Sequence, residues 1–513
     1  MPHPGAGLHT LGRWTTDRAA ATGDRVAVDD RGVRLSYRDL DGRAVALADR
    51  LVAAGYTTGD RIATITGNSS DQVVLFFACA KAGFVLVPLS WRLSPRELAQ
   101  HLETADPALL LVEDEFASLA AAALDRLADR VTVGSLGVDG IERAVAQHAA
   151  PTPRRPVADD DALLIVFTSG TVDRPKGAIL THANCFWTNL ALSRTAWMTG
   201  SDVVLAVMPQ FHVGGWDIQP LLAWWMGATV VLERTFDAGR VLQLIRERRI
   251  TTMMGVPANY LLLAEHPLFP EADVSSLRRA VVGGAPMPEP LLRTWHRRGV
   301  ALTQGYGLTE ASPNVLCLSD EDARSRAGLA GRPYPHVAVA VADPVTGEML
   351  DGVATGELLV SGPSVFPGYF RDEAATVQVL RDGWLHTGDL VHRDADGYYR
   401  VVDRIRDIFI SGGESIAPAE IEAVLRENPG VAEVAVVGSP HPRWGETGVA
   451  FVVARAGVAT DAESLALWCA DRLAKFKVPT GFVFLPALPR NSTGKALRRE
   501  LAARVAGTIG VTQ

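Results

Sequence analysis

The segment Phe167–Gly177, which reads FTSGTVDRPKG, combines hydroxyl side chains, glycine and a lysine in a pattern suited to phosphate binding. Backbone N–H groups of such a loop can surround phosphate oxygens, and the ammonium of Lys176 adds a positive charge. The segment lacks the G-x-x-x-x-G-K-[ST] spacing, so it is not a Walker loop. Taken alone, it is equally compatible with a solvated surface turn.

Three further motifs place a carboxylate or a lysine beside glycine-rich turns. They are GYGLTE, which ends at Glu310, GWLHTGD, which ends at Asp389, and PRNSTGK, which ends at Lys495. A lone glutamate beside phosphates suits a hard cation that takes oxygen ligands. An ionised aspartate only accepts hydrogen bonds, which matches a diol. The alternatives are a solvated loop carboxylate for Glu310, a turn-forming aspartate for Asp389 and a surface lysine for Lys495.

Five motifs follow one another along the chain: TSGT…PKG, GYGLTE, GWLHTGD, DRIRD at Asp403–Asp407, and PRNSTGK. This series resembles the adenylate-forming superfamily, which comprises acyl-CoA synthetases, peptide-synthetase adenylation domains and luciferases. The resemblance covers nearly the whole chain. The C-terminal half, with ISGGESIAPAEIE at Ile410–Glu422 and with PRNSTGK, looks most like fatty- and aryl-acyl-CoA synthetases.

The resemblance implies an acyl-CoA ligase, an acid–thiol ligase that works in two steps. A carboxylate attacks the α-phosphate of ATP, which gives an acyl adenylate (acyl-AMP) and pyrophosphate. The thiol of coenzyme A then attacks the acyl carbonyl and releases AMP. Because the first step is an in-line displacement at phosphorus, the protein contributes mainly positioning and charge neutralisation, much of the latter through Mg²⁺.

The family pattern also implies which residues bind the nucleotide. Thr309 would contact the α-phosphate and Glu310 would bind Mg²⁺, which makes both expected catalytic residues. Glycines in GYGLTE would permit close backbone approach, and Tyr306 would offer a flat face to adenine. The residues expected to bind the nucleotide are Thr168, Ser169, Gly170, Thr171, Lys176, Gly284, Ala285, Gly305, Tyr306, Gly307, Asp389 and Arg404.

The C-terminal motifs imply the remaining nucleotide contacts. Lys495 corresponds to the catalytic lysine of adenylation, whose mobile ammonium would stabilise charge on the α-phosphate and on the attacking carboxylate. Asp389 would accept hydrogen bonds from both ribose hydroxyls, with Arg404 beside it. The small C-terminal domain of the family rotates between the two steps. Its pivot corresponds to Arg406, where the family more often has aspartate or lysine.

The thiol and acid sites follow from the same resemblance. His212 is expected to separate the acyl pocket from the ATP site, with Gly214 and Trp216 in the pocket wall. The alternative for His212 is a histidine of the hydrophobic core, and the alternative for the run around Lys475 is a basic surface loop. The residues expected to line the coenzyme A tunnel are Ser411, Gly412, Gly413 and Lys475.

The phosphate loop departs from the family pattern T-S-G-T-T/S-G-x-P-K-G at Val172 and Asp173. Val172 removes a hydroxyl, and Asp173 adds a carboxylate where pyrophosphate should lie. Two unit charges about 4 Å apart interact by at most about 4 kcal/mol at an effective dielectric of about 20. One hypothesis is therefore an adenylation-impaired ligase that mainly transfers a preformed acyl adenylate to coenzyme A. We favour the alternative, in which Asp173 points to solvent and pairs with Arg174.

The elements that must position these residues alternate between helix and strand. Apolar spacing predicts a helix over Asp39–Val52, a strand at Arg61–Thr66, a buried helix at Ser70–Lys81 and a strand at Phe84–Leu89. This order implies a parallel sheet covered by helices. A further predicted strand, Ala162–Phe167, leads directly into the phosphate loop.

The expected fold class is α/β with two domains. By resemblance, residues 1–403 form a large acyl- and nucleotide-binding domain of two helix-sandwiched sheets plus a distorted β-barrel. Near Val401 the sequence changes to short strands and small helices, including the helix Pro418–Arg426 and the strand Ala432–Gly438. Residues 404–513 are therefore expected to form a small, mobile α+β domain, with the active site at the junction.

Composition argues against several other classes of protein. The 513 residues include 50 Lys+Arg against 58 Asp+Glu, a net charge of −8, so a nucleic-acid-binding protein is not expected. The least polar stretch, Ile218–Leu232, is 15 residues long, whereas a membrane span needs about 20. Charged residues precede any apolar run at the N-terminus, and no C-x-x-C pair occurs among the four cysteines. We therefore expect no signal peptide, no membrane span and a cytoplasmic location.

Several other functions stay open beside the CoA ligase. An enzyme that loads a carrier protein would pass the acyl group to a phosphopantetheinyl protein. An inactive nucleotide-binding protein is a second alternative, against which the retention of Glu310, Asp389 and Lys495 argues. A luciferase-like oxygenase is a third. The acid (fatty, aryl or bulky polycyclic) and the oligomeric state, with a homodimer as one option, are not determined by the sequence.

Overall fold

The computed structural model describes residues 7–129, 131–136, 155–168, 175–285, 287–411, 414–441, 445–473, 477–490 and 495–509. Its internal contacts divide the chain into two compact units. The first unit is Met1–Val339 with Leu359–His386, and the second is Ala340–Leu358 with Thr387–Gln513. The division differs from the boundary expected after Asp403. The expected boundary and the pivot at Arg406 refer to a rotation of residues 404–513 between the two reaction steps, so both stay predictions.

The first unit is built around a nine-stranded sheet with the order β15-β14-β13-β12-β11-β9-β10-β1-β2. The six strands from β13 to β1 in that order are parallel to their neighbours, and the strands at both edges are antiparallel. The strands are β1 (Val26–Asp30), β2 (Val33–Ser36), β9 (Val203–Ala206), β10 (Thr229–Leu232), β11 (Thr252–Gly255), β12 (Arg279–Val282), β13 (Ala301–Tyr306), β14 (Leu316–Cys317) and β15 (Arg332–Pro333).

A second sheet of the same unit has the order β6-β5-β3-β4-β7-β8. It is parallel from β6 to β7, and β8 returns antiparallel to β7 as a hairpin. Its strands are β3 (Arg61–Ile65), β4 (Val85–Leu89), β5 (Leu109–Val112), β6 (Val133–Ser135), β7 (Ala162–Thr168) and β8 (Lys176–Thr181).

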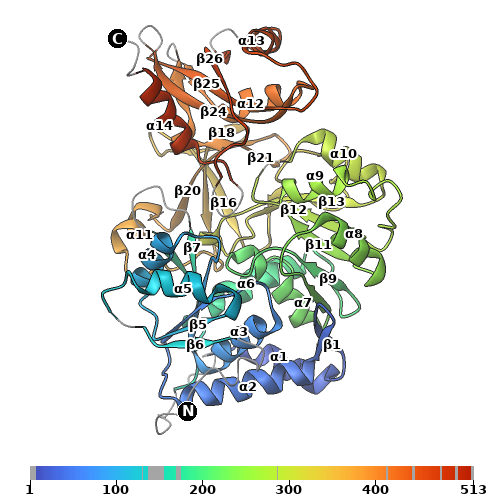
Figure 1. Cartoon of the computed structure of the whole chain (residues 1–513), viewed down its shortest axis with the longest axis vertical. Helices are drawn as coiled ribbons and strands as arrows, with labels where there is room; N and C mark the ends of the chain where they lie inside the picture. Colours follow the sequence, from blue (N-terminus) through green and yellow to red (C-terminus); the bar gives the residue numbers. More distant parts are fainter. Residues whose placement is uncertain are drawn as a thin grey trace. The chain divides into compact units, whose positions relative to one another are not determined.

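Helices cover these sheets, as the sequence predicted. Figure 1 shows α8, α9 and α10 along the nine-stranded sheet, and their apolar side chains share one core with β9, β11, β12 and β13. Helix α3 is buried along nearly its whole length and contacts both β1 and β4, which places it between the two sheets. The helices of this unit are α1 (Gly12–Thr22), α2 (Tyr37–Ala53), α3 (Ser70–Ala82), α4 (Pro95–Ala105), α5 (Ala117–Leu124), α6 (His182–Ser193), α7 (Pro220–Met226), α8 (Ala238–Glu247), α9 (Pro257–Glu265), α10 (Glu289–Arg297) and α11 (Glu373–Val379).

Local signals explain why these helices begin and end where they do. Ser36 forms a capping box with Asp39 at the start of α2, and Ser69 caps α3 by accepting a hydrogen bond from a backbone N–H. Gly83 ends α3 in the left-handed conformation at φ +77°, which glycine adopts without strain. The elements predicted between Asp39 and Leu89 and before the phosphate loop are confirmed.

The remaining strands form two further sheets. One has the order β17-β16-β18-β20-β19 with β21 beside β20, an open path among the described pairings where the barrel subdomain was expected. The other is the five-stranded sheet β23-β22-β25-β24 with β26 beside β25. The helices α12 and α14 contact β24, and α13 contacts β26. The strands are β16 (Ala338–Ala342), β17 (Met349–Leu350), β18 (Ala354–Ser361), β19 (Leu380–Arg381), β20 (Trp384–Arg393), β21 (Tyr399–Arg404), β22 (Phe409–Ser411), β23 (Glu414–Ile416), β24 (Val431–His441), β25 (Gly445–Ala454) and β26 (Gly481–Phe484), and the helices are α12 (Pro418–Arg426), α13 (Ala462–Ala470) and α14 (Arg498–Ile509).

The predicted helix Pro418–Arg426 is confirmed as α12, and the predicted strand Ala432–Gly438 lies within β24. The α/β fold class is thus confirmed. In the part of the chain that the structure describes, no helix combines the length and apolar character needed to span a bilayer.

Candidate active site

The loops expected to bind substrates in the first unit follow the carboxyl ends of neighbouring parallel strands. His212 lies in the segment after β9, Gly284 and Ala285 follow β12, and Tyr306 ends β13. Because these strands are parallel, the segments leave the nine-stranded sheet at the same edge. Ligands of open α/β sheets bind at this edge, so the topology brings together residues that are far apart in the sequence.

The phosphate loop connects the two strands of the β7–β8 hairpin. Thr168 and Lys176 are paired across this hairpin, and the Thr168 hydroxyl donates to the Lys176 carbonyl oxygen over 3.5 Å. Both side chains are half-buried. The intervening residues Ser169, Gly170 and Thr171, together with Val172 and Asp173, lie outside the described residues.

Tyr369 links the lysine of the phosphate loop to the acidic residue of GYGLTE. Its hydroxyl donates to Oε1 of Glu310 over 2.7 Å, and the Lys176 ammonium lies 5.2 Å from the centroid of its ring. Glu310 sits in the 3₁₀ turn Thr309–Ala311 directly after β13, and its carbonyl oxygen accepts from the backbone N–H of Phe366. Thr309 is half-buried in the same turn. A cation and a carboxylate are therefore held beside one aromatic ring.

The glycines of GYGLTE have different roles in this turn. A Cβ on Gly307 would lie 1.3 Å from the Pro313 carbonyl oxygen, so only glycine fits there. A Cβ on Gly305 would meet nothing closer than the Leu316 carbonyl oxygen at 3.5 Å, an ordinary contact. Gly307 is thus required by the turn itself, whereas a Cβ at Gly305 would make only an ordinary contact.

Burial keeps the imidazole of His212 neutral. It lowers the pKa of His212 to about 4, with a smaller contribution in the same direction from the Arg92 guanidinium. The His212 ring packs against Phe211 at 4.6 Å between centroids, and its buried Nε2 has no hydrogen-bond partner among the described residues. At neutral pH this side chain can donate or accept a hydrogen bond, but it carries no charge.

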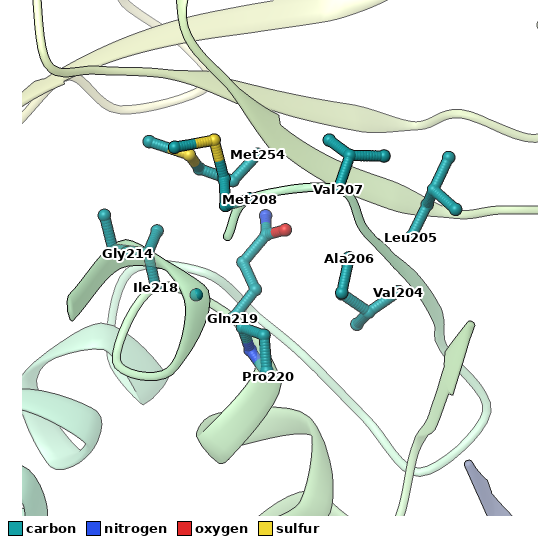
Figure 2. A pocket seen from close by; sticks show the side chains of 11 residues that line it. Val204, Leu205, Ala206, Val207, Met208, Gly214, Ile218, Gln219, Pro220 and Met254 are labelled. Carbon is teal, nitrogen blue, oxygen red and sulfur yellow. The ribbon is translucent and has the colours of Figure 1, made fainter. Parts of the chain in front are cut away.

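A small, mostly apolar cavity of the first unit lies between β9 and the segment that leads into α7. Its walls include Gly214, Met208, Met254 and Gln219, and Figure 2 shows the Gln219 side chain extending toward the two methionines. The assignment of Gly214 to the acyl pocket stays a prediction. Trp216 is not among the described residues that line it. The Trp216 ring is fully buried, stacks on Phe76 at 4.7 Å, and donates from Nε1 to the Gln210 carbonyl oxygen, so Trp216 belongs to the core.

The second unit brings Asp389 and Arg404 together. They are opposite each other in the antiparallel pair β20–β21, and Nε of Arg404 lies 2.5 Å from Oδ1 of Asp389. The Asp389 residue is only 3% exposed, and its backbone N–H donates to the Thr387 hydroxyl. A buried carboxylate that retains one ion-pair partner can accept hydrogen bonds from a diol.

The remaining predicted residues of the second unit are spread over its elements. Arg406 lies in the 3₁₀ turn Ile405–Asp407, Ser411 ends β22 and is buried, and Lys495 is exposed in the turn before α14. Gly412, Gly413 and Lys475 lie outside the described residues.

The donor set around Glu310 suits Mg²⁺. No group of three or more His, Cys, Asp or Glu side chains gathers at a metal-binding distance among the described residues. The Tyr369 hydroxyl binds only one oxygen of the Glu310 carboxylate in the described contacts. Mg²⁺ is usually held by one or two carboxylates plus substrate phosphates and water, so a lone oriented glutamate fits it.

Comparisons with known proteins agree with this geometry. The family model of the AMP-binding enzyme matches residues 15–370, and that of the AMP-binding enzyme C-terminal domain matches residues 420–495. The chain belongs to the AMP-binding enzyme family.

This AMP-binding enzyme has relatives that match it over almost its whole length. It is 41% identical to feruloyl-CoA synthase of an Amycolatopsis species, over 96% of this chain and 99% of the relative. It is 39% identical to indoleacetate–CoA ligase of Aromatoleum aromaticum, over 96% of this chain and 98% of the relative. It is also 37% identical to the fatty acid–[acyl-carrier-protein] ligase ScoC of Streptomyces coeruleorubidus, over 98% of this chain and 97% of the relative.

Solved structures give the same result. The ATP-bound MatB of Rhodopseudomonas palustris superposes with a TM-score of 0.87 at 32% identity, over 97% of this chain and 98% of that chain. MenE of Bacillus subtilis, solved with its acyl-adenylate intermediate, superposes with a TM-score of 0.85 at 31% identity, over 95% and 97% of the two chains. The resemblance stated from the motifs is confirmed, and this AMP-binding enzyme is an acyl-CoA ligase, an acid–thiol ligase that acts through an acyl adenylate.

Two residues of this site were not predicted from the sequence. Tyr369 follows Gly368 in the run PGYF, far along the chain from Lys176, and only the fold places it between Lys176 and Glu310. Gln219 is the single polar side chain among the described residues that line the small cavity of Figure 2. Its signal in the sequence is a glutamine directly before Pro220 within an otherwise apolar stretch.

Proposed function

We propose that this AMP-binding enzyme converts an aromatic carboxylic acid to its coenzyme A thioester, with ATP and coenzyme A as co-substrates and Mg²⁺ as cofactor. The observation that carries the proposal is the placement of Lys176 and Glu310 on either side of Tyr369. The aromatic class is supported by the names of two relatives at 41% and 39% identity, which act on ferulate and indoleacetate.

In the first step the acid carboxylate attacks the α-phosphorus of ATP, and pyrophosphate leaves. Thr168, Lys176 and the loop between them bind the β- and γ-phosphates, where the Lys176 ammonium neutralises charge that moves onto the leaving group. Thr309 contacts the α-phosphate. Glu310 would hold Mg²⁺, which would neutralise further charge on the phosphate oxygens when bound. Lys495 stabilises the charge that is shared by the α-phosphate and the attacking carboxylate.

In the second step the sulfur of coenzyme A attacks the acyl carbonyl, the bond between the acyl carbon and the phosphate oxygen breaks, AMP leaves, and the thiol proton passes to solvent water. Asp389 and Arg404 bind the ribose in both steps, because ATP and the acyl adenylate share it. The uncharged imidazole of His212 separates the acid from the phosphates without adding a competing cation. Rotation of residues 404–513 about Arg406 brings Ser411 and the loop after it to the thiol.

The experiment is a pair of assays on one panel of acids. ATP–pyrophosphate exchange measures the first step, and release of coenzyme A thioester measures both steps. We expect exchange and thioester formation with cinnamic and phenylacetic acids and much weaker turnover of decanoic acid. A clear preference for decanoic acid would overturn the aromatic class while leaving the ligase activity intact.

A second candidate is the adenylation-impaired ligase, because Val172 and Asp173 replace residues of the family pattern. Such an enzyme would form thioester from a synthetic acyl adenylate and coenzyme A, but would give almost no exchange. The Asp173→Gly variant would then gain exchange by about tenfold or more, since about 1.4 kcal/mol in the transition state is tenfold in rate. Robust exchange by the natural protein removes this hypothesis.

A third candidate takes a carrier protein as thiol, which the 37% identity to ScoC favours. Coenzyme A and a phosphopantetheinyl carrier protein, offered in the same reaction, separate the two acceptors. An inactive nucleotide-binding protein would bind ATP and give no product with either acceptor. The homodimer and the cytoplasmic location stay predictions.

A further inference from the structure

We take the small cavity of Figure 2 as the site of the acyl group and call it the acyl cavity. A second, larger cavity of the first unit lies at the other end of the strands that border it. Its volume is about 220 Å³, and its walls include Asp202, Thr251 and Arg279, which lie at the amino ends of β9, β11 and β12. We call this cavity the vestibule. Gln219 lines both the vestibule and the acyl cavity, so its side chain lies between them.

The backbone of Gln219 is strained. Its φ of +82° and ψ of −52° correspond to a γ-turn region that residues with a side chain rarely adopt. The next residue, Pro220, has no N–H that could close the turn with a hydrogen bond. Such strain persists where the surrounding structure imposes it, often at ligand sites. It holds the Gln219 side chain at the boundary between the two cavities.

The amide of Gln219 is only partly satisfied. The residue is 3% exposed, and Nε2 donates to the Thr252 hydroxyl over 2.7 Å. Its buried Oε1 has no hydrogen-bond partner among the described residues. A buried amide group without a partner is costly. A ligand hydroxyl satisfies the free end of this amide in either orientation, because a hydroxyl both donates and accepts.

The acyl cavity is almost closed by its own side chains. Its volume of about 10 Å³ holds about one water, whereas one benzene ring occupies an engineered cavity of about 150 Å³. An aromatic acid therefore enters only if flexible groups move. Met208, Met254 and Gln219 are flexible side chains that line this cavity (Figure 2), and the vestibule offers Gln219 the space to withdraw.

The polar groups of the vestibule are already neutralised in pairs. Arg278 pairs with Asp202 over 2.6 Å, and Arg279 pairs with Asp320. A second carboxylate on the substrate finds no uncompensated charge there. An uncharged hydroxyl fits the wall better, because it exchanges hydrogen bonds with these groups without a charge that must be desolvated.

We propose that Gln219 is a specificity-determining residue that closes the acyl cavity, withdraws toward the vestibule when an aromatic acid enters, and hydrogen-bonds a hydroxyl at the far end of that acid. This inference rests on the proposed function, because it names the class of acid at the same site. The preferred substrate is thus an elongated hydroxyaryl acid rather than an unsubstituted one.

The test compares 4-hydroxycinnamic acid with cinnamic acid, which differ only in the distal hydroxyl. The natural enzyme should show a kcat/KM about tenfold higher for the hydroxy acid, the effect of one hydrogen bond to an otherwise unpaired buried group. Gln219→Met keeps the length of the side chain and removes the amide, so the ratio should fall to about one. Ile218→Val alters the same wall without touching the amide and should change both acids alike.

A second variant tests whether the Gln219 side chain withdraws toward the vestibule. Gln219→Gly relieves the positive φ and opens the acyl cavity to the vestibule, so it should turn over 4-butoxycinnamic acid at least about tenfold faster than the natural enzyme does. Thermal unfolding of each variant shows whether it is folded. This inference is overturned, and the proposed function is left intact, if the kcat/KM ratio of the two acids is unchanged in Gln219→Met or if the natural enzyme shows no preference for the hydroxy acid. If neither 4-hydroxycinnamic acid nor cinnamic acid supports pyrophosphate exchange, the aromatic class in the proposed function fails, and this inference fails with it.

Discussion

The hydroxyl of Tyr369 donates to Glu310 over 2.7 Å while the face of the same ring lies 5.2 Å from the ammonium of Lys176. The two contacts orient a carboxylate and a cation that come from different sheets and from distant parts of the sequence. A hydrogen bond to one carboxylate oxygen leaves the other oxygen for a metal ion. Residues that orient a metal ligand in this way typically change metal affinity or activity by 10–100-fold when they are replaced.

The Tyr369→Phe variant tests this orientation. It removes the hydrogen bond to Glu310 and keeps the ring that faces Lys176, so we expect the Mg²⁺ concentration for half-maximal pyrophosphate exchange to rise about tenfold. The folded stability should change little. Tyr56→Phe, which removes a hydroxyl in the loop between α2 and β3, is the matched control. An unchanged Mg²⁺ dependence in Tyr369→Phe would show that the hydroxyl does not orient a metal ligand.

The two reaction steps should respond differently to variants in the two units. Lys176→Met removes the positive charge that is expected beside the pyrophosphate leaving group of the first step. Pyrophosphate exchange should therefore fall about 100-fold. Thioester formation from a synthetic acyl adenylate should stay within about twofold, because that substrate has no β- or γ-phosphate. Asp389→Asn weakens ribose binding, which both steps share, and should raise KM about tenfold for ATP and for the acyl adenylate alike. If Lys176→Met slows both steps equally, its assignment to the β- and γ-phosphates is wrong.

Three histidines, of which His182 is buried and His101 and His212 are half-buried with one ring nitrogen enclosed, should make this enzyme sensitive to acid. Burial lowers the pKa of His101, His182 and His212 to about 4 in each case, from an ordinary value of 6.5. Below pH 6.5 the unfolded chain binds protons that the folded chain does not, so the stability that these groups contribute above pH 6.5 is lost as the pH falls toward 4. Each group contributes at most about 3 kcal/mol to this loss.

His101 offers a direct measurement of this effect. Its ring stacks on Phe167 at 4.2 Å, and its buried Nδ1 has no hydrogen-bond partner among the described residues. In His101→Leu the urea midpoint should fall less steeply between pH 7 and pH 5 than in the natural enzyme. His266→Gln, a half-buried histidine after α9, is the control and should leave the slope unchanged. Parallel slopes in His101→Leu and the natural enzyme would contradict the prediction.

The sequence predicts the elements of this fold well because their signals are local. The apolar spacing of Asp39–Val52 gives α2, and the serine caps and Gly83 define where α3 begins and ends. The order of the motifs predicted the family without any knowledge of the strand order. It also predicted which ligand group Lys176, Glu310 and Asp389 each bind: phosphate, Mg²⁺ and ribose. Arg404 could be placed beside Asp389 only by resemblance, and the β20–β21 register gives the physical reason.

Other parts of the site depend on contacts that no local pattern encodes. Tyr369 lies 59 residues from its partner Glu310, and the aromatic ring carries no motif of its own. Trp216 follows the glycines that were expected in the acyl pocket, yet it stacks on Phe76 of α3 and belongs to the core. In the apolar stretch Ile218–Leu232, Trp224 is fully buried in the core, whereas Gln219 near its start faces two cavities. Whether an apolar neighbourhood encloses a core residue or a substrate is decided by packing across layers.

The glycines of GYGLTE provide the last prediction, because the structure separates two residues that the motif treats alike. In Gly307→Ala the new Cβ would lie 1.3 Å from the Pro313 carbonyl oxygen. That carbonyl cannot shift freely, since the next side chain, Asn314, donates to the Thr188 hydroxyl and to the Asp217 carbonyl oxygen in the core. We expect Gly307→Ala to lower the free energy of unfolding by about 3 kcal/mol and to abolish exchange.

Gly305→Ala is the matched control, because its Cβ would meet no described atom closer than 3.5 Å. Its urea midpoint should equal that of the natural enzyme within error. If the nucleotide approaches the backbone at Gly305, the methyl group should nevertheless raise KM for ATP by about tenfold through a steric clash. Unchanged stability with a raised KM would therefore assign Gly305 to the nucleotide and Gly307 to the turn. Equal loss of stability in both variants would show that the two glycines serve the fold alone.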